Sequence, residues 1–139
     1  MRTRLTEGLS RAMSACLLAA AIALPAAAAE LTTQKNVGGG VTVAVTPQNV
    51  SGDIKTWTFK VVLDTHSQDL SDDLVKSSRL LDGTGGRYAP VAWDGAEPGG
   101  HHREGTLGFN AISPRPASVE LQIQRPGEPK PRSFRWQLR

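Results

Sequence analysis

The sequence predicts an all-β protein built as one antiparallel β-sandwich of about seven strands. Three observations predict it. Apolar residues recur at every second position in several segments after residue 40, which is the period of a half-buried strand. Stretches rich in glycine and proline, such as 82–87 and 125–131, separate these segments and have the composition of turns. No helical period of useful length follows residue 29.

Each expected strand rests on its own alternation. Strict alternation predicts strands over 41–46, 55–63, 107–109, 119–123 and 134–138, and weaker patterns predict strands over 75–81 and 88–93. Seven short strands at this spacing are typical of an immunoglobulin-like sandwich. The same alternation places the three tryptophans on inward positions, so we expect Trp57, Trp93 and Trp136 in the core.

The expected domain spans residues 41–139. Residues 30–40 end in three glycines and are expected to form a flexible lead-in or a loosely attached edge strand. One helical turn is expected in the stretch LSDDLV. In it Ser71 would cap the N-terminus, and Asp72 and Asp73 would lie in the first turn, where negative charge is favoured.

The first 29 residues have the features of a secretory signal peptide. Three arginines precede the apolar run 17–24, and three alanines at 27–29 supply the small residues that signal peptidase requires before Glu30. Cys16 precedes the apolar run, so it would be removed with the signal instead of carrying a lipid. The predicted location is the periplasm or the cell exterior, with no membrane span after cleavage.

Charge and cysteine content exclude several functions. The first 29 residues hold three of the 16 basic and one of the 13 acidic residues, so residues 30–139 carry 13 basic and 12 acidic side chains and a net charge of +1. Binding to nucleic acid by long-range attraction is therefore not expected. Residues 30–139 contain no cysteine, which excludes a disulfide and a thiolate nucleophile there.

Strand polarity predicts where the polar loops lie. Because successive antiparallel strands run in opposite directions, the loops 64–74, 94–104 and 125–131 should share one end of the sandwich, and 82–87 and 112–116 the other. All three histidines, His66, His101 and His102, then lie at one end. Loops gathered at one end of a rigid sandwich commonly carry function.

A metal site is one interpretation of these histidines. His66 with His101 or His102, and Asp64 or Asp94 as the oxygen ligand, would suit zinc or copper(II). Counting alternation along the flanking strands places His101 inward and both His66 and His102 outward, which makes His66, His102 and Asp64 the preferred set. Alternatively, each ring donates to a backbone carbonyl and fixes a loop. A calcium site at Asp69, Asp72 and Asp73 is less favoured, because a helix cap already accounts for two of them.

Catalysis is poorly supported. Ser67 adjoins His66, but no G-x-S-x-G stretch is present. Asp64 and Glu104 would form an acid–base pair without the aromatic cleft that a sugar substrate needs. A non-enzymatic protein is therefore predicted. A cluster of basic residues is expected on a solvated hairpin, in which RPGE forms a type II turn with Gly127 at positive φ; its members are Arg125, Lys130, Arg132 and Arg135.

Two stretches carry a resemblance: VVLDTHSQDLSDDL at 61–74 and GGHHREGTLGF at 99–109. Together they resemble a family of small exported bacterial β-sandwich proteins, immunoglobulin-like and of unassigned function. The resemblance implies a single compact β domain in the periplasm or on the cell surface. The chain is also similar to periplasmic copper carriers of immunoglobulin-like fold. It lacks their histidine at the mature N-terminus and their methionine-rich loops, so copper(I) transfer is not expected.

The sequence thus predicts an exported module that binds an unknown protein or small ligand through the loops 64–74 and 94–104, without a cofactor. The expected contact residues are Asp64, His66, His101, His102 and Arg103. The alternative is a periplasmic protein that binds zinc or copper(II) through His66 and His101 or His102.

Overall fold

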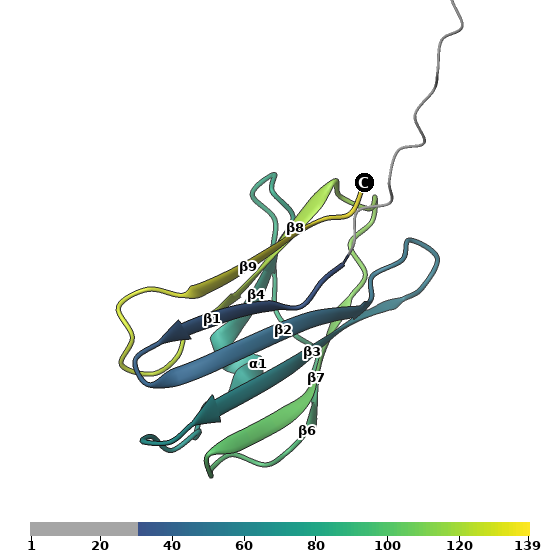
Figure 1. The fold of residues 1–139 in the computed structure, drawn as a ribbon. Coiled ribbons are helices and arrows are strands. Elements are labelled where there is room, and N and C mark those ends of the chain that lie inside the picture. Colours follow the sequence, from purple (N-terminus) through teal and green to yellow (C-terminus); the bar gives the residue numbers. More distant parts are fainter. Residues whose placement is uncertain (1–30) are drawn as a thin grey trace, which may run out of the picture.

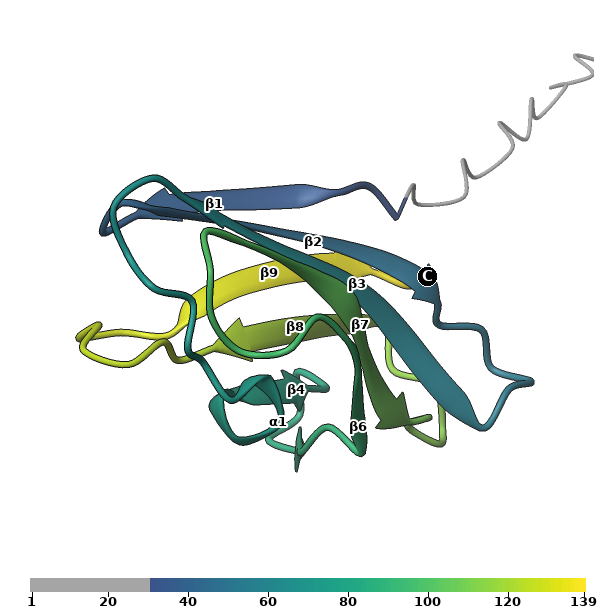
Figure 2. The same ribbon diagram turned by 90° about the horizontal axis from the view of Figure 1, so that it is seen from below.

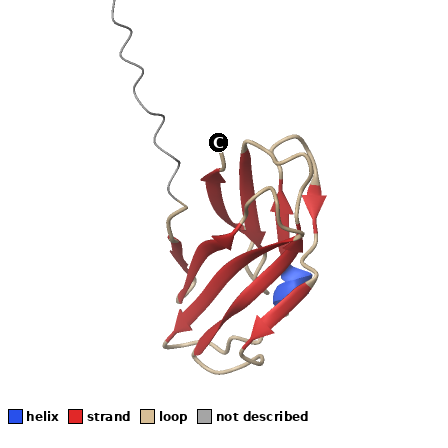
Figure 3. Cartoon of the chain, turned by 90° about the vertical axis from the view of Figure 1, so that its right-hand side faces the viewer, coloured by secondary structure: helices blue, strands red, loops and turns tan. Residues whose placement is uncertain are grey.

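The computed structural model describes residues 31–139, and the predicted signal peptide and Glu30 lie outside them. The described chain forms nine strands and one helical turn, arranged as two antiparallel sheets packed face to face (Figures 1 and 3). The elements are β1 (Gln34–Gly38), β2 (Val41–Asn49), β3 (Thr56–Thr65), α1 (Leu74–Ser77), β4 (Ser78–Leu81), β5 (Arg87–Tyr88), β6 (Ala92–Gly95), β7 (His102–Asn110), β8 (Ser118–Ile123) and β9 (Arg132–Gln137). Within residues 31–139 no helix is long and apolar enough to span a membrane.

The strand order is that of an immunoglobulin-like sandwich. One sheet has the order β1-β2-β3-β7-β6 and the other β5-β4-β8-β9. The strands β2-β3-β7-β6 take the places of A-B-E-D, and β4-β8-β9 take those of C-F-G. β1 and β5 each add one strand at a sheet edge. The fold class predicted from alternation is therefore confirmed.

The segment before residue 41 contains an edge strand, which is one of its two expected forms. Gly39 and Gly40 both have positive φ and make the turn from β1 into β2. The far side of β1 faces β9, where the Gln34 amide exchanges hydrogen bonds with the backbone of Arg135. The Trp136 indole donates to Thr32 O at 2.8 Å. Side-chain hydrogen bonds from both strands therefore fasten β1 and the residues before it to β9, across the gap between the two sheets.

The core lies between the sheets and is filled by the inward positions of the alternating strands. Phe59 lies at its centre, edge-on to Phe109 and tilted against Trp136, with both ring centroids 5.7 Å away. Trp57 and Trp136 are buried, as expected, whereas Trp93 on the edge strand β6 is only half-buried. The contact between Phe59 on β3 and Trp136 on β9 joins the two sheets without a covalent link, whereas Phe59 and Phe109 belong to the same sheet.

The helical turn begins later than predicted. Asp73 is its N-cap, and its carboxylate accepts from Lys76 N at 3.1 Å. Assigning the cap to Ser71 was therefore wrong, because Asp72 turns into the interior and the helical residues start only at Leu74. Figure 2 shows α1 at the side of the sandwich, beside β4 and β6.

Two glycines make room for Trp93 where β6 meets β7. A Cβ added at Gly105 would lie 2.6 Å from Trp93 Cζ2 and 2.7 Å from Gly95 Cα. Gly108 lies on the same strand, and a Cβ there would come no closer than 3.6 Å to any atom. Alanine substitution at either glycine changes strand propensity in the same way. Comparing the two substitutions therefore isolates the cost of close packing at Gly105.

We predict that Gly105→Ala lowers the free energy of unfolding by about 1–3 kcal/mol, because the methyl group collides with a ring and a backbone that have no room to move. Gly108→Ala, the matched control, should leave stability unchanged or raise it by up to about 1 kcal/mol. Urea denaturation of both variants measures the difference. Equal stability of the two variants would contradict the packing.

Candidate functional site

Four connections meet at one end of the sandwich, at the lower left of Figure 1. They are the turn 39–40, the loops 66–73 and 96–101, and the hairpin 124–131. The opposite end carries 82–86 and 111–117. The predicted polarity is confirmed, and His66, His101 and His102 line one pocket.

The backbones of the two histidine-bearing loops are hydrogen-bonded to each other. Thr65 N donates to His101 O at 2.9 Å. Leu70 N donates to Gly100 O at 3.1 Å, and Gly99 N returns a bond to Leu70 O at 2.9 Å. The Asp69 carboxylate accepts from Gly100 N. The loops are thus fixed along their length, and Asp69 is used as a loop cap.

Arg103 clamps these loops from inside. Its guanidinium donates to Leu70 O at 3.0 Å, to Asp72 O at 2.7 Å and to Ala96 O at 3.3 Å. The guanidinium carbon lies 5.5 Å from the centre of the Trp93 ring. Only 1% of Arg103 is exposed, which removes it as the direct contact residue that the sequence suggested. Its position follows from alternation, because Arg103 shares the inward face of β7 with Leu107.

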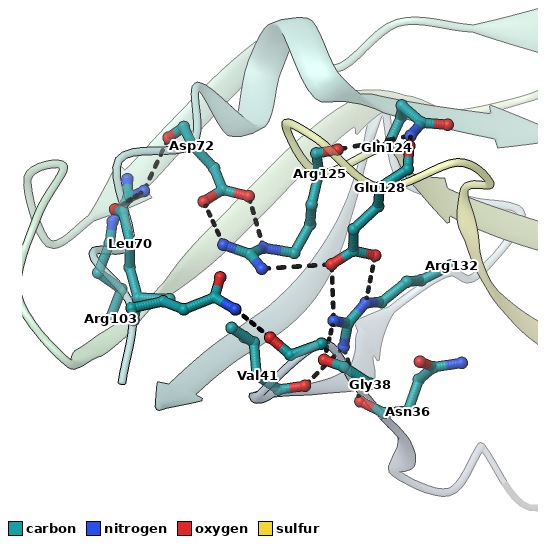
Figure 4. Close-up of polar contacts among 12 residues, drawn as sticks. Asn36, Gly38, Val41, Leu70, Asp72, Arg103, Gln124, Arg125, Glu128 and Arg132 are labelled. Atoms are coloured by element: carbon teal, nitrogen blue, oxygen red, sulfur yellow. Dashed lines mark hydrogen bonds and ion pairs between the residues drawn. The ribbon is translucent and has the colours of Figure 1, made fainter. Parts of the chain in front are cut away.

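A buried ion-pair network lies beside this clamp (Figure 4). The Arg125 guanidinium bonds both carboxylate oxygens of Asp72, at 2.9 and 3.0 Å, and Glu128 at 3.2 Å. Glu128 also accepts from Arg132 at 2.7 and 3.0 Å. Burial alone would lower the pKa of Arg125, but the bonds to Asp72 raise the pKa above its ordinary value. Arg132 lowers the pKa of the Glu128 carboxyl.

Arg132 extends the network to the other sheet. Its guanidinium donates to Val41 O at 2.8 Å, Asn36 O at 3.0 Å and Gly38 O at 2.6 Å, so it binds the carbonyls around the turn from β1 into β2. The expectation of a solvated basic hairpin was therefore wrong for Arg125 and Arg132, which are 5% and 4% exposed. Gly127 does adopt the positive φ expected of the RPGE turn, and Glu128 N donates to Arg125 O.

The three imidazoles are exposed around a pocket of about 430 Å³. Its remaining lining comes from Gly40, Thr42, Asp64 and Thr65. The volume is within the range of small-ligand sites. His101 is exposed and not inward as alternation predicted, because β7 begins only at His102.

His102 lies between two carboxylates on the outer face of the sheet. Its Nδ1 donates to Asp64 Oδ1 at 2.5 Å, and its Nε2 lies 3.6 Å from Glu104 Oε2. The bond to Asp64 raises the pKa of His102 above its usual value. Lys60 bonds Glu104 at 2.6 Å and lowers the pKa of that carboxyl. Sequence reasoning missed Lys60, although its register opposite Thr106 places it on the same face of the sheet as Glu104.

The same arrangement bears on metal binding. Asp64 is occupied as the partner of His102 Nδ1, so it orients the ring and does not stand free as an oxygen ligand. Metal-binding histidines commonly donate their second nitrogen to a carboxylate in this way. Across residues 31–139, no three His, Cys, Asp or Glu side chains are placed to hold one metal ion.

Comparison of the chain with protein-family models, with curated proteins and with solved structures finds no match. The geometry therefore defines the class: an immunoglobulin-like β-sandwich with an exposed histidine pocket on clamped loops.

We predict that Asp72→Asn destabilises the protein by about 3–5 kcal/mol, because it removes the bidentate counter-charge of the buried Arg125 and leaves only Glu128, which Arg132 shares. Asp73→Asn is the control, since Asp73 is exposed and an asparagine also caps a helix. Thermal and urea unfolding measure both variants. A small loss for Asp72→Asn, equal to that of the control, would contradict the network.

The His102 ring should titrate at a pH above its ordinary midpoint of about 6.5, since Asp64 stabilises the charged ring. Asp64→Asn should lower that midpoint, whereas Asp94→Asn, which removes an exposed carboxylate on β6, should not. NMR of the ring protons between pH 5 and 9 follows the titration. An unshifted midpoint in Asp64→Asn would exclude the pair.

Proposed function

We propose that the protein is an exported, non-enzymatic β-sandwich module that binds a protein or small ligand at the histidine pocket between the loops 64–74 and 94–104. Asp64, His66, His101 and His102 are the contact residues. Arg103 acts from beneath, as a positioning residue. The resemblance to small exported β-sandwich proteins and the predicted signal peptide support the export assignment.

One observation carries the proposal: the loops have fixed backbones and exposed side chains. Seven hydrogen bonds from backbone groups, Asp69 and Arg103 hold these loops, while His66, His101 and His102 face solvent. A surface ordered before it binds loses less conformational entropy on binding, so more of its contact energy becomes affinity. Histidines that served only to fix the loops would use their ring nitrogens on backbone carbonyls. His102 instead bonds a carboxylate.

A second function, binding of zinc or copper(II), is favoured by a specific contact. The bond from His102 Nδ1 to Asp64 orients the ring and leaves Nε2 as its remaining nitrogen, 3.6 Å from a Glu104 carboxylate that is paired with Lys60. His66 and His101 line the same pocket. Rotation of one of these side chains would supply a further nitrogen ligand.

Site-specific photo-crosslinking in cells that express the full chain tests the leading proposal. A photoreactive residue at position 66 or 101 should give discrete adducts. The same residue at Thr84, exposed at the opposite end, should not give them. Absence of adducts at 66 and 101, or identical adducts at 84, would refute binding at the pocket.

Calorimetric titration of the purified protein with zinc and copper(II) tests metal binding separately from partner binding. Metal binding should be micromolar or tighter and should disappear in both His66→Ala and His102→Ala. Binding that survives both substitutions would exclude this site.

A further inference from the structure

The outer face of the β5-β4-β8-β9 sheet carries a row of four side chains from four strands. Leu81 pairs with Arg87 on one side and with Glu120 on the other, and Glu120 pairs with Arg135. Cross-strand partners point to the same face of a sheet. Leu80, Leu121 and Phe134 alternate with them and are buried, so the row faces outward.

This face has a surplus of positive charge. The four strands hold the arginines Arg79, Arg87, Arg132 and Arg135 but a single acidic residue, Glu120. Arg132 is directed inward, while Arg87 and Arg135 are exposed. Glu120 accepts from Ser133, Gln122 and Arg135, and the Ser133 bond lowers the pKa of its carboxyl. Within residues 31–139, the Arg87 guanidinium makes no hydrogen bond or ion pair.

A groove of about 390 Å³ runs beside the row. Leu81 provides apolar lining, and one wall consists of Gly83, Gly85 and Gly86. These glycines present backbone without side chains, which permits close approach of another chain. Asp82 holds the wall in place by accepting from Thr84 N at 2.8 Å, Gly86 N at 3.0 Å and the Tyr88 hydroxyl at 3.0 Å.

We infer that this groove binds a short acidic peptide segment of a partner protein. Its carboxylates pair with Arg87 and Arg135, because a guanidinium binds a carboxylate through two parallel hydrogen bonds. An apolar side chain of the peptide packs on Leu81. The peptide backbone lies against the glycine wall, where the absence of side chains permits its close approach. A polyphosphate or sulfated sugar carries no apolar side chain that would pack against the apolar lining.

The inference is tested by fluorescence anisotropy with the purified full chain. The probe is a fluorescein-labelled peptide of alternating glutamate and leucine, and a lysine–leucine peptide is the comparison. The acidic peptide should bind, and the basic peptide should not. Arg87→Glu should weaken binding about tenfold or more. Lys35→Glu makes the same charge change on the outer face of the other sheet and should change affinity less than twofold.

Two further variants complete the test. Arg87→Gln should weaken binding without reversing the charge, and His66→Ala should leave peptide affinity unchanged, which keeps this site separate from the histidine pocket. No binding of the acidic peptide would overturn the inference, as would an equal loss in Lys35→Glu. Binding of a heparin fragment in place of the peptide would also overturn it and assign the groove to a polyanionic sugar.

Discussion

The buried pairing of Asp72 with Arg125 fixes the end of the sandwich where the loops meet. Asp72 lies on the connection from one sheet to the other, Arg125 follows β8, and Arg103 on β7 donates to the backbone carbonyl of Asp72. One aspartate thus receives two arginines from different sheets. Immunoglobulin domains commonly join their sheets with a disulfide. Residues 30–139 contain no cysteine, and here guanidinium groups make the polar connection.

Burial of Arg103, Arg125 and Arg132 costs desolvation free energy, and hydrogen bonds and ion pairs offset that cost. A guanidinium leaves water favourably only when its donors find acceptors in a suitable geometry. Arg125 bonds two carboxylates, and Arg132 bonds Glu128 and three carbonyls. Arg103 has three carbonyls and the Trp93 ring, although its buried Nε has no hydrogen-bond partner within residues 31–139. The carboxylates and the carbonyls that Arg103 bonds belong to loops, so the bonds to the buried arginines also order the loops that carry the histidines.

The sequence was sufficient for the two-sheet fold, although the strand predicted over 75–81 begins only at Ser78 and β7 begins five residues before the predicted 107. It was insufficient for the buried arginine contacts, for a physical reason. Alternation is local, so Val41 to Val45 or Phe134 to Trp136 reveal a buried face directly. Strand polarity then places three histidines at one end. The same alternation puts Arg103 in line with Leu107 and Arg132 in line with Phe134, yet residue type suggested solvent for both. Their acceptors, such as Asp72 and Val41, are distant in sequence, and only the folded chain brings them together. Asp72 was assigned to the first turn of a helix because a local role is the one a sequence can show.

Arginine therefore has two roles in this protein, and the hydrogen-bond acceptors near each arginine determine which role it has. The inward arginines find carboxylates and carbonyls and become part of the framework. Arg87 and Arg135 face outward on a sheet whose single carboxylate is already bonded to Ser133, Gln122 and Arg135. On the outer face of the other sheet, Lys60, Glu104, His102 and Asp64 compensate one another. The two outer faces thus differ in how many of their charged side chains are paired with one another. A charged side chain without such a pair is available to a partner.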